Sequence, residues 1–495
     1  MKRTLFYNIL SCPLLCLGSI QAQEMKLTLG ETIDRASESS LSAIKAQRSY
    51  LSGYWEYRSF KAERLPSLTL DLTPAQYNHR IVERYDSYLD RDIYRSQRSY
   101  YASGGLAIQQ NVDWTGGKLY VEADVDYLRY FGASTYTQFT SVPFRIGYSH
   151  SLVGYNDFKW DKKIEPIKYQ KKQKELTYDM VRVSEEAIGY FFSLAQAQAE
   201  HELARKNLAS CDTLYSIGRQ REKIAAISKA DLLTLQLDVV NAKNTLVNSE
   251  MTLKRAMFQL ASFLNLDKET PIKITLPERP VAVIVTTDKA LEQTRINNPE
   301  IIALKQSILE SKRSVDRTRK ESYFNMSINA SVGFNQVADQ FKEVWKDLRQ
   351  QDMVALTVSI PIIDWGVRKG KYNMAKNNLS VVETSAQQSQ QNIEEEVIMT
   401  VSDFNIQADV IKSAEEARGL AESAYEDTRM RFIIGKSDIN SLSLALSRKD
   451  AAQKNYITAL KNYWLSYYKI KRLTLYDFEQ DRPIEAHVHD HTFTR

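Results

Sequence analysis

The stretch TLGETIDRASESSLSAIKAQ at residues 28–47 has a counterpart in TTDKALEQTRINNPEIIALK at residues 286–305. The correspondence continues without a gap to residues 73 and 331, at a constant offset of 258 residues. In both copies a helical pattern leads into an alternating strand, a second strand follows, and a helical pattern of about a hundred residues comes next. Ordinary soluble domains have elements that average about a dozen residues, so two copies of a unit with short strands and very long helices indicate a different architecture.

The chain divides into five segments. Lys2 and Arg3 precede an apolar stretch and a small-residue cleavage site at Ala22, so we expect residues 1–22 to be a secretory signal peptide. The other segments are a first repeat at 23–270, a linker at 271–287, a second repeat at 288–477 and a C-terminal tail at 478–495. Cys211 is the one cysteine that follows the signal, so no intrachain disulfide or thiolate metal site is expected.

The charge balance argues against nucleic acid as a partner, because the chain carries 66 basic and 61 acidic residues. After the signal, no apolar run approaches the 18 or so residues that a membrane helix needs. If this exported protein enters a membrane, it must therefore do so with strands.

The long helical patterns carry heptad seams, in which apolar residues recur at alternate steps of three and four. The first seam consists of Leu176, Met180, Val183, Ala187, Tyr190, Leu194, Ala197, His201, Ala204, Leu208, Cys211 and Tyr215. Similar seams run through 232–263, 393–411 and 442–470, which predicts two long helical hairpins. A helix of some 60 residues spans about 90 Å. Helical seams alone would equally fit a solvated coiled coil.

The predicted strands have one apolar and one polar face, as strands of a membrane barrel do. In the second repeat Met326, Ile328, Ala330, Val332 and Phe334 alternate with polar or small residues. From the second strand of the repeat onward the offset falls from 258 to 210, so the first copy carries roughly 48 extra residues between its strands. These residues are predicted to form an added hairpin with its turn at Thr115-Gly116-Gly117. This hairpin either enlarges a barrel or folds outside it. Its acidic residues Glu122, Asp124 and Asp126 are predicted to face the lumen and to favour cations.

Four core strands cannot close a barrel, and open sheet edges in lipid cost several kcal/mol for each unpaired backbone group. We therefore expect several chains to share one membrane barrel, stacked on a tunnel of long helices.

With these features the chain resembles the TolC-like outer-membrane efflux proteins over about residues 27–477. The resemblance rests on LTLGETIDRA and its echo DKALEQTRINNPEI, on the strand-to-helix junctions SIPIIDWGVRKG and SHSLVGYNDFKW, and on the hairpins LYSIGRQREKIAAISKADLL and RFIIGKSDINSLSLAL. It implies an α+β fold in which a membrane all-β barrel continues into a long α-helical coiled-coil barrel. It also implies an outer-membrane homotrimer with a 12-stranded β-barrel on a periplasmic 12-helix α-barrel. Its implied partners are outer-membrane lipid, a periplasmic adaptor protein and an inner-membrane transporter, and the linker resembles the family's equatorial layer.

The resemblance also implies where the helix tips lie. Gly218 and Gly435 each follow an aromatic residue by three positions, and a glycine suits a left-handed helix C-cap. The turn near Gly218 is expected to be longer than the family's tight turn. The residues expected to dock the adaptor and surround the closed aperture are Ile217, Gly218, Arg219, Ile434, Gly435, Lys436, Ser437, Asp438 and Ser441. Only Asp438 among them is acidic, so the aperture is expected to be less charge-selective than in the family.

Neither an enzyme nor a cofactor is expected, because no phosphate loop, HExxH motif or nucleophile elbow is present. The histidines His487, His489 and His491 are weak candidates for a metal site, since they follow Pro483 in a tail. The leading function is a passive exit duct of an efflux or secretion system. The alternatives are a non-conducting coiled-coil surface or structural protein and a soluble periplasmic adaptor.

Overall fold

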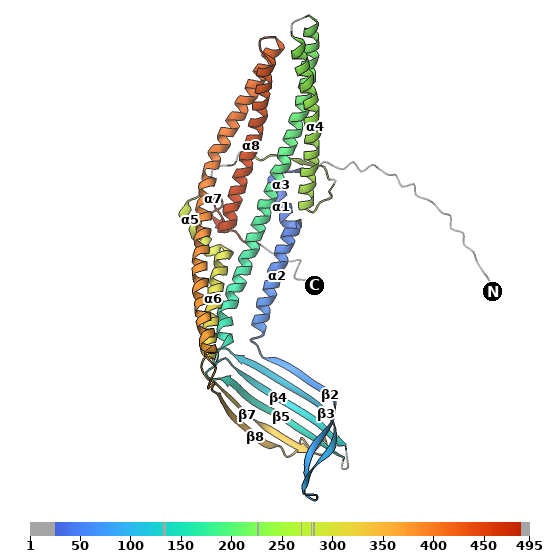
Figure 1. Ribbon diagram of the computed structural model, residues 1–495, viewed down its shortest axis with the longest axis vertical. Coiled ribbons are helices and arrows are strands. Elements are labelled where there is room, and N and C mark those ends of the chain that lie inside the picture. Colours follow the sequence, from blue (N-terminus) through green and yellow to red (C-terminus); the bar gives the residue numbers. More distant parts are fainter. Residues whose placement is uncertain are drawn as a thin grey trace, which may run out of the picture.

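One strongly curved sheet and two long helical hairpins lie at opposite ends of an elongated molecule (Figure 1). The computed structural model describes residues 25–131, 135–224, 227–268, 270–278, 280 and 283–486. The expected signal peptide and the tail histidines His487, His489 and His491 lie outside the described residues.

The helix boundaries confirm the internal duplication. The N-caps of the two short helix pairs, Thr28 and Ser40 in the first repeat and Thr286 and Asn298 in the second, keep the offset of 258. These caps open α1 (Leu29–Ser39), α2 (Leu41–Ala62), α5 (Thr287–Asn297) and α6 (Pro299–Glu321). Each cap side chain except that of Thr286 accepts a backbone hydrogen bond from the first turn, which fixes where the helix starts.

The long helices correspond at the offset of 210. The first hairpin consists of α3 (Asp157–Lys223) and α4 (Lys229–Phe263), and the second of α7 (Val367–Ile433) and α8 (Ile439–Thr474). Each α-hairpin begins with a 67-residue helix, and each connector between its helices spans five residues, 224–228 and 434–438. Ser228 and Asp231 form a capping box at the start of α4.

Six strands form one antiparallel sheet in the order β2-β3-β4-β5-β7-β8. They are β2 (Ser67–Asp86), β3 (Arg91–Val112), β4 (Gly117–Phe131), β5 (Tyr136–Ser151), β7 (Asn325–Ala338) and β8 (Arg349–Ser359). The four predicted core strands are present, and the inserted hairpin, β3 and β4, lies between β2 and β5 within the same sheet. The 12 strands per trimer that the resemblance implies would take four strands from each chain, whereas this sheet has six. From the pair Arg80 and Gln97 to the pair Asp86 and Arg91, β2 and β3 continue as a two-stranded ribbon at the end far from the helices (Figure 1).

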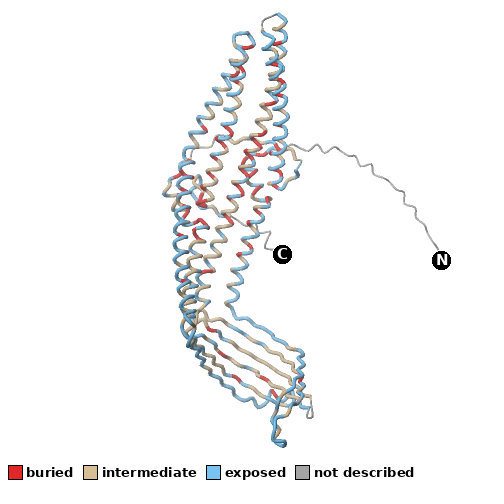
Figure 2. The backbone as a smooth tube through the Cα atoms, in the orientation of Figure 1, coloured by how far each residue is buried: buried red, intermediate tan, exposed pale blue. Residues whose placement is uncertain are grey.

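The predicted strand faces are confirmed. Leu68, Leu70 and Leu72 stay more than 60% exposed on β2, and large apolar side chains on β3, β7 and β8 are likewise open on the same face. The opposite face carries hydroxyl, amide and acidic side chains. In Figure 2 the sheet shows few buried residues, whereas the helical part contains most of them.

A core lies where the short and long helices meet. Phe191, Phe192, Phe404 and Leu460 are at most 1% exposed in this region. Two pairs of short strands flank it: β1 (Met25–Leu27) pairs in parallel with β6 (Ile272–Ile274), and β9 (Tyr476–Asp477) pairs antiparallel with β10 (Arg482–Pro483). In the described part of the chain, no helix is both long and apolar enough to cross a membrane.

Candidate functional site

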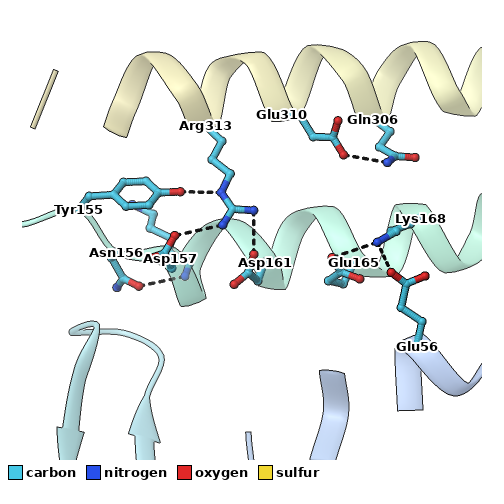
Figure 3. Close-up of polar contacts among 11 residues, drawn as sticks. Glu56, Tyr155, Asn156, Asp157, Asp161, Glu165, Lys168, Gln306, Glu310 and Arg313 are labelled. Carbon is cyan, nitrogen blue, oxygen red and sulfur yellow. Dashed lines mark hydrogen bonds and ion pairs between the residues drawn. The ribbon is translucent and has the colours of Figure 1, made fainter. Parts of the chain in front are cut away.

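The junction between sheet and helices is held by an arginine fork (Figure 3). Arg313 on α6 donates from Nε to the Tyr155 hydroxyl at 2.7 Å and from Nη2 to Asp157 Oδ1 at 3.0 Å, and its Nη1 lies 2.9 Å from Asp161 Oδ1. A planar guanidinium suits several fixed acceptors at once, so the side chain fixes α6 against the first turns of α3. The two helices belong to different repeats, so the fork joins the repeats at the helix ends next to the sheet.

Lys168 makes a second connection at this level, toward α2 (Figure 3). Its ammonium group donates to Glu56 and lies 3.9 Å from Glu165 Oε1. Burial raises the pKa of Glu165, with Lys168 opposing and Glu56 adding to the shift. The acidic face at the start of α3 (Asp157, Asp161, Glu165) thus meets Arg313 of α6 and Lys168 of α3 itself, and Lys168 extends the contact to Glu56 of α2.

The polar face of the sheet carries the three acidic residues predicted to line the lumen. Glu122, Asp124 and Asp126 lie on this face of β4, in the inserted hairpin. Arg145 on β5 donates to Glu122 Oε2 at 2.5 Å and lies 3.8 Å from Asp124 Oδ2, and the Tyr101 hydroxyl donates to Asp126 at 2.8 Å. Sequence reasoning did not find Arg145, which offsets one of the three negative charges.

The second helix tip is built as predicted. Gly435 adopts a left-handed conformation with φ +80°, directly after the last turn of α7. Asp438 caps α8 by accepting from the Ser441 backbone N–H at 2.7 Å and from its hydroxyl at 2.9 Å. These bonds hold the pKa of the Asp438 carboxyl below its usual range. Ile434, Gly435 and Lys436 are exposed at the end of the molecule, with Ser437 beside them.

The first tip lies elsewhere than predicted. Ile217, Gly218 and Arg219 belong to the last turns of α3, which ends at Lys223, and the turn of this hairpin spans residues 224–228. The expectation of a left-handed cap at Gly218 is wrong, because this glycine lies within α3. Gly218 is buried in the helix, where a Cβ atom would lie 2.5 Å from Leu235 Cδ1. It therefore allows close approach of α4.

Arg221 connects the two tips, and sequence reasoning missed it. Its Nη2 donates to the carbonyl oxygens of Ile433 at 2.9 Å and Phe432 at 3.5 Å, and its guanidinium lies over the Phe432 ring. Carbonyls at a helix C-terminus have no partner within the helix and attract cations. Arg221 thus holds the first hairpin to the end of α7.

Two other candidates have structural roles. His201, a member of the predicted α3 seam, has its Nδ1 atom 3.3 Å from the Ser249 hydroxyl. Burial raises the pKa of the Cys211 thiol to about 11, which makes it an unreactive apolar residue. The described residues contain no cluster of metal-binding side chains.

Comparisons with known proteins give a family match for the second repeat and a fold match for the whole chain. Residues 290–474 match the family described as "Outer membrane efflux protein". No curated protein matches the chain.

Among solved structures, the Campylobacter jejuni CmeC outer membrane channel matches with a TM-score of 0.66 and 11% identity, over 93% of this chain and 87% of that one. A membrane protein from Pseudomonas aeruginosa matches with a TM-score of 0.64 and 15% identity, over 90% of each chain. The open state of the Neisseria gonorrhoeae MtrE outer membrane channel matches with a TM-score of 0.61 and 15% identity, over 92% and 91%. None of these three is described as an enzyme. Residues 290–474 thus match the outer membrane efflux protein family, and the chain as a whole has the fold of solved outer-membrane channels.

Proposed function

We propose that three copies of this chain form a passive exit duct through the outer membrane, with the helical part in the periplasm. In this proposal the helix tips dock a periplasmic adaptor protein, which joins the duct to an inner-membrane pump or exporter. The family of residues 290–474 supports efflux, and the fold supports a channel.

A difference between the two repeats supports assembly of several copies. Within the chain α3 packs against α2 and α4 of its own repeat and against α6 and α8 of the other. Its counterpart α7 packs against α5, α6 and α8, all of its own repeat, and has no comparable contact with α2 or α4. Since α7 is the counterpart of α3, and α4 is the counterpart of α8, the contact equivalent to α3 with α8 is α7 with α4. This contact is not made within the chain and is therefore left for α4 of a neighbouring copy. This unmatched pair of equivalent surfaces is the observation that carries the proposal.

The exposed surfaces have the composition that such a contact requires. On α4 the exposed residues follow a heptad spacing opposite the buried seam: Leu233, Leu237, Val240, Asn244, Val247, Met251, Lys254 and Phe258. On α7 the open apolar residues include Ile398, Met399, Ile406 and Val410, each at least 44% exposed. Exposed apolar patches of this extent favour burial against a partner.

An in-chain ion pair defines the expected neighbour contact. Lys454 on α8 lies 3.1 Å from Glu200 on α3. At the offset of 210, Lys454 corresponds to Asn244 on α4 and Glu200 corresponds to Val410 on α7. Asn244 of one copy is therefore expected to lie beside Val410 of the next.

Cysteine cross-linking tests this arrangement in membranes. In a Cys211→Ala background, Asn244→Cys with Val410→Cys is treated with a short bis-maleimide and resolved under denaturing conditions. We expect bands of one, two and three chains and none larger. The matched control, Glu200→Cys with Lys454→Cys, should cross-link only within one chain. A ladder that passes three copies, or no bands above one chain, would contradict the proposal.

Adaptor docking is tested separately at the second tip. A photo-reactive amino acid at Ile434 or Lys436 should capture a periplasmic protein that extends from the inner membrane, because these side chains are exposed at the end of the helical part. The same amino acid at Lys412, midway along α7, serves as the control. Equal capture at both positions would argue against a tip-specific contact.

A further inference from the structure

We propose that the inserted hairpin is part of the membrane wall, so that three copies of this six-stranded sheet close an 18-stranded barrel. The copy number rests on the proposed trimer. The place of β3 and β4 in the wall rests on four observations within one chain.

First, the backbone ladder runs through the insertion without a break between strands. β3 pairs with β2 from Gln109 to Arg91 and with β4 from Val112 to Arg98. β4 in turn pairs with β5, which pairs with β7 of the second repeat. A hairpin folded outside the wall would instead leave β2 and β5 paired directly with each other.

Second, the inserted strands carry the same alternation in the same register as the core strands. Leu68 on β2 lies opposite Ile108, Ile108 opposite Val121, Val121 opposite Ile146, and Ile146 opposite Val332 on β7. A one-residue slip would have moved the apolar residues of β3 and β4 to the polar face. The apolar face is therefore continuous over the inserted strands, as a lipid-facing wall requires.

Third, a line of aromatic rings crosses the inserted strands on this apolar face. The ring centroids of Tyr100 on β3 and Tyr127 on β4 are 6.0 Å apart, and those of Tyr127 and Phe139 on β5 are 5.0 Å apart. The line continues to Phe341 at 5.7 Å and Trp345 at 6.0 Å, both in the β7–β8 loop. Aromatic girdles mark the membrane–water interface of barrels, and here the girdle includes one residue from each inserted strand.

Fourth, the polar face is fitted around the insertion. The Tyr120 side chain on β4 reaches across β5 and donates to Asn329 Oδ1 on β7 at 3.3 Å. It passes over Gly147, where a Cβ atom would lie 2.3 Å from the tyrosine ring. Gly105 on β3 similarly leaves room for Asp124, since a Cβ atom there would lie 2.2 Å from Oδ1. These contacts join the insertion to both repeats.

The sheet edges also fit closure by identical copies. β2 starts at the end of α2 and β8 leads toward α7, so the two edge strands run in opposite directions between the helical end and the far end. An even number of strands per copy lets β2 of one copy pair antiparallel with β8 of the next. Barrel diameter grows roughly linearly with strand number, and barrels of about 16–18 strands enclose an aqueous channel.

In this arrangement the membrane barrel is wider, while the number of helices around the helical part is unchanged. Each copy still contributes four long helices, α3, α4, α7 and α8, while its sheet gains two strands. The helical part then limits the size of the exported solute, and the barrel forms a wide vestibule whose inserted strands supply Glu122, Asp124 and Asp126.

Thiol labelling of the purified trimer in liposomes tests the wall. Single cysteines in the Cys211→Ala background are placed on the apolar face at Leu106→Cys and Val121→Cys and on the polar face at Ala107→Cys and Glu122→Cys. Val332→Cys and Ser331→Cys provide the matched pair in core strand β7. A water-soluble maleimide should react at least ~10-fold more slowly on the apolar face in β3, β4 and β7 alike, because the reagent is excluded from hydrocarbon.

The possible results separate this inference from the proposed duct. Rapid labelling of both faces of β3 and β4, with alternation in β7, would overturn the inference and leave the duct intact. Loss of alternation in β7 itself would overturn the membrane barrel. A detergent-corrected mass of two chains would overturn the count of 18, whereas a mass of three chains with alternation in all three strands supports it.

Discussion

Ile188 on α3 is fully buried, whereas Ile398, its counterpart 210 residues later on α7, leaves 44% of its surface exposed. The duplication gives the chain two equivalent helix surfaces, and only the one on α3 is covered within a single copy. The open surface is apolar, so its burial by another copy is favourable at roughly 25 cal/mol for each Å² removed from water.

Introducing charge on the open faces should prevent assembly without unfolding the chain. Met251→Asp on α4 and Ile406→Asp on α7 place a carboxylate on side chains that are 59% and 56% exposed in one copy. Each is expected to cost the assembly several kcal/mol, because an unpaired charge would be buried between copies. Light scattering should then report single chains with unchanged circular dichroism. The control Asn248→Asp, on a flank of α4, should remain trimeric. If Met251→Asp is also trimeric, the exposed face of α4 is not a contact between copies.

Loss of the Arg313 fork should loosen the junction between the sheet and the helices. Arg313→Ala removes contacts with Asp157 and Asp161 on α3 and with Tyr155 just before it, and bonds to charged groups are worth about 1.5–3 kcal/mol when well formed. Amide hydrogen exchange at the C-terminal end of α6 should accelerate by about tenfold or more, equivalent to about 1.4 kcal/mol. Arg205→Ala is the control, since Arg205 is exposed and pairs only within its own helix. Equal protection in both variants would assign the junction to apolar packing.

Asp450 should make the helical part less stable as pH rises. Burial raises the pKa of its carboxyl, with Lys454 and Lys449 opposing, and no described residue donates a hydrogen bond to Oδ1. Because the folded state binds this proton more tightly than the unfolded state, the stabilisation is complete below the unfolded pKa. It is lost as pH rises through the folded pKa.

Asp450→Asn should therefore be more stable than wild type at pH 7, and the advantage should disappear below about pH 4, near the unfolded value. Thermal unfolding from pH 3 to pH 8 provides the measurement. Asp427→Asn, whose exposed carboxyl pairs with Arg431, is the control. An advantage of Asp450→Asn that is constant with pH would contradict the assigned titration.

Gly435→Val should impair export while sparing assembly. Its φ of +80° is costly for a β-branched residue, roughly 1–2 kcal/mol or more, and the turn lies far from the sheet. Two quantities are measured: the rate at which the producing cells export the solute carried by the system, and the amount of trimer in the outer membrane. Gly419→Val within α7 is the control, because a Cβ atom there meets nothing within 4 Å. Normal export by Gly435→Val would mean that the tip geometry is not critical.

The internal duplication made most of the architecture predictable. The offset of 258 places the N-caps of the short helices and the starts of β2 and β7, and the offset of 210 places both ends of α3 and α7. The same offset, applied to the tips, pairs the turn 434–438 with residues 224–228. The matching aromatic-to-glycine spacing at Gly218 was misleading, because this glycine serves helix packing.

Other features depend on partners that a single heptad pattern does not reveal. Ile188, Phe191 and Phe192 are buried off the predicted seam of α3, because that helix packs against neighbours from both repeats. Arg313 and Arg221 find acceptors 156 and 212 residues away in the chain. The spacing of Asp157, Asp161 and Glu165 gave a signal for a charged helix face, but not for the arginine that it meets. The alternation in β4 predicted a strand, whereas its place in the sheet depends on pairing with β3 and β5.

Electrical conductance of the purified protein in a planar bilayer tests the central claim most directly. We expect discrete conductance steps that favour cations, because each copy adds Glu122, Asp124 and Asp126 to the proposed lumen face against Arg145. It also predicts larger steps for Arg221→Ala, since that change removes the bonds from the first hairpin to the end of α7. Trimeric, membrane-inserted protein that conducts no ions, either as wild type or as Arg221→Ala, would contradict the account and favour a non-conducting structural protein.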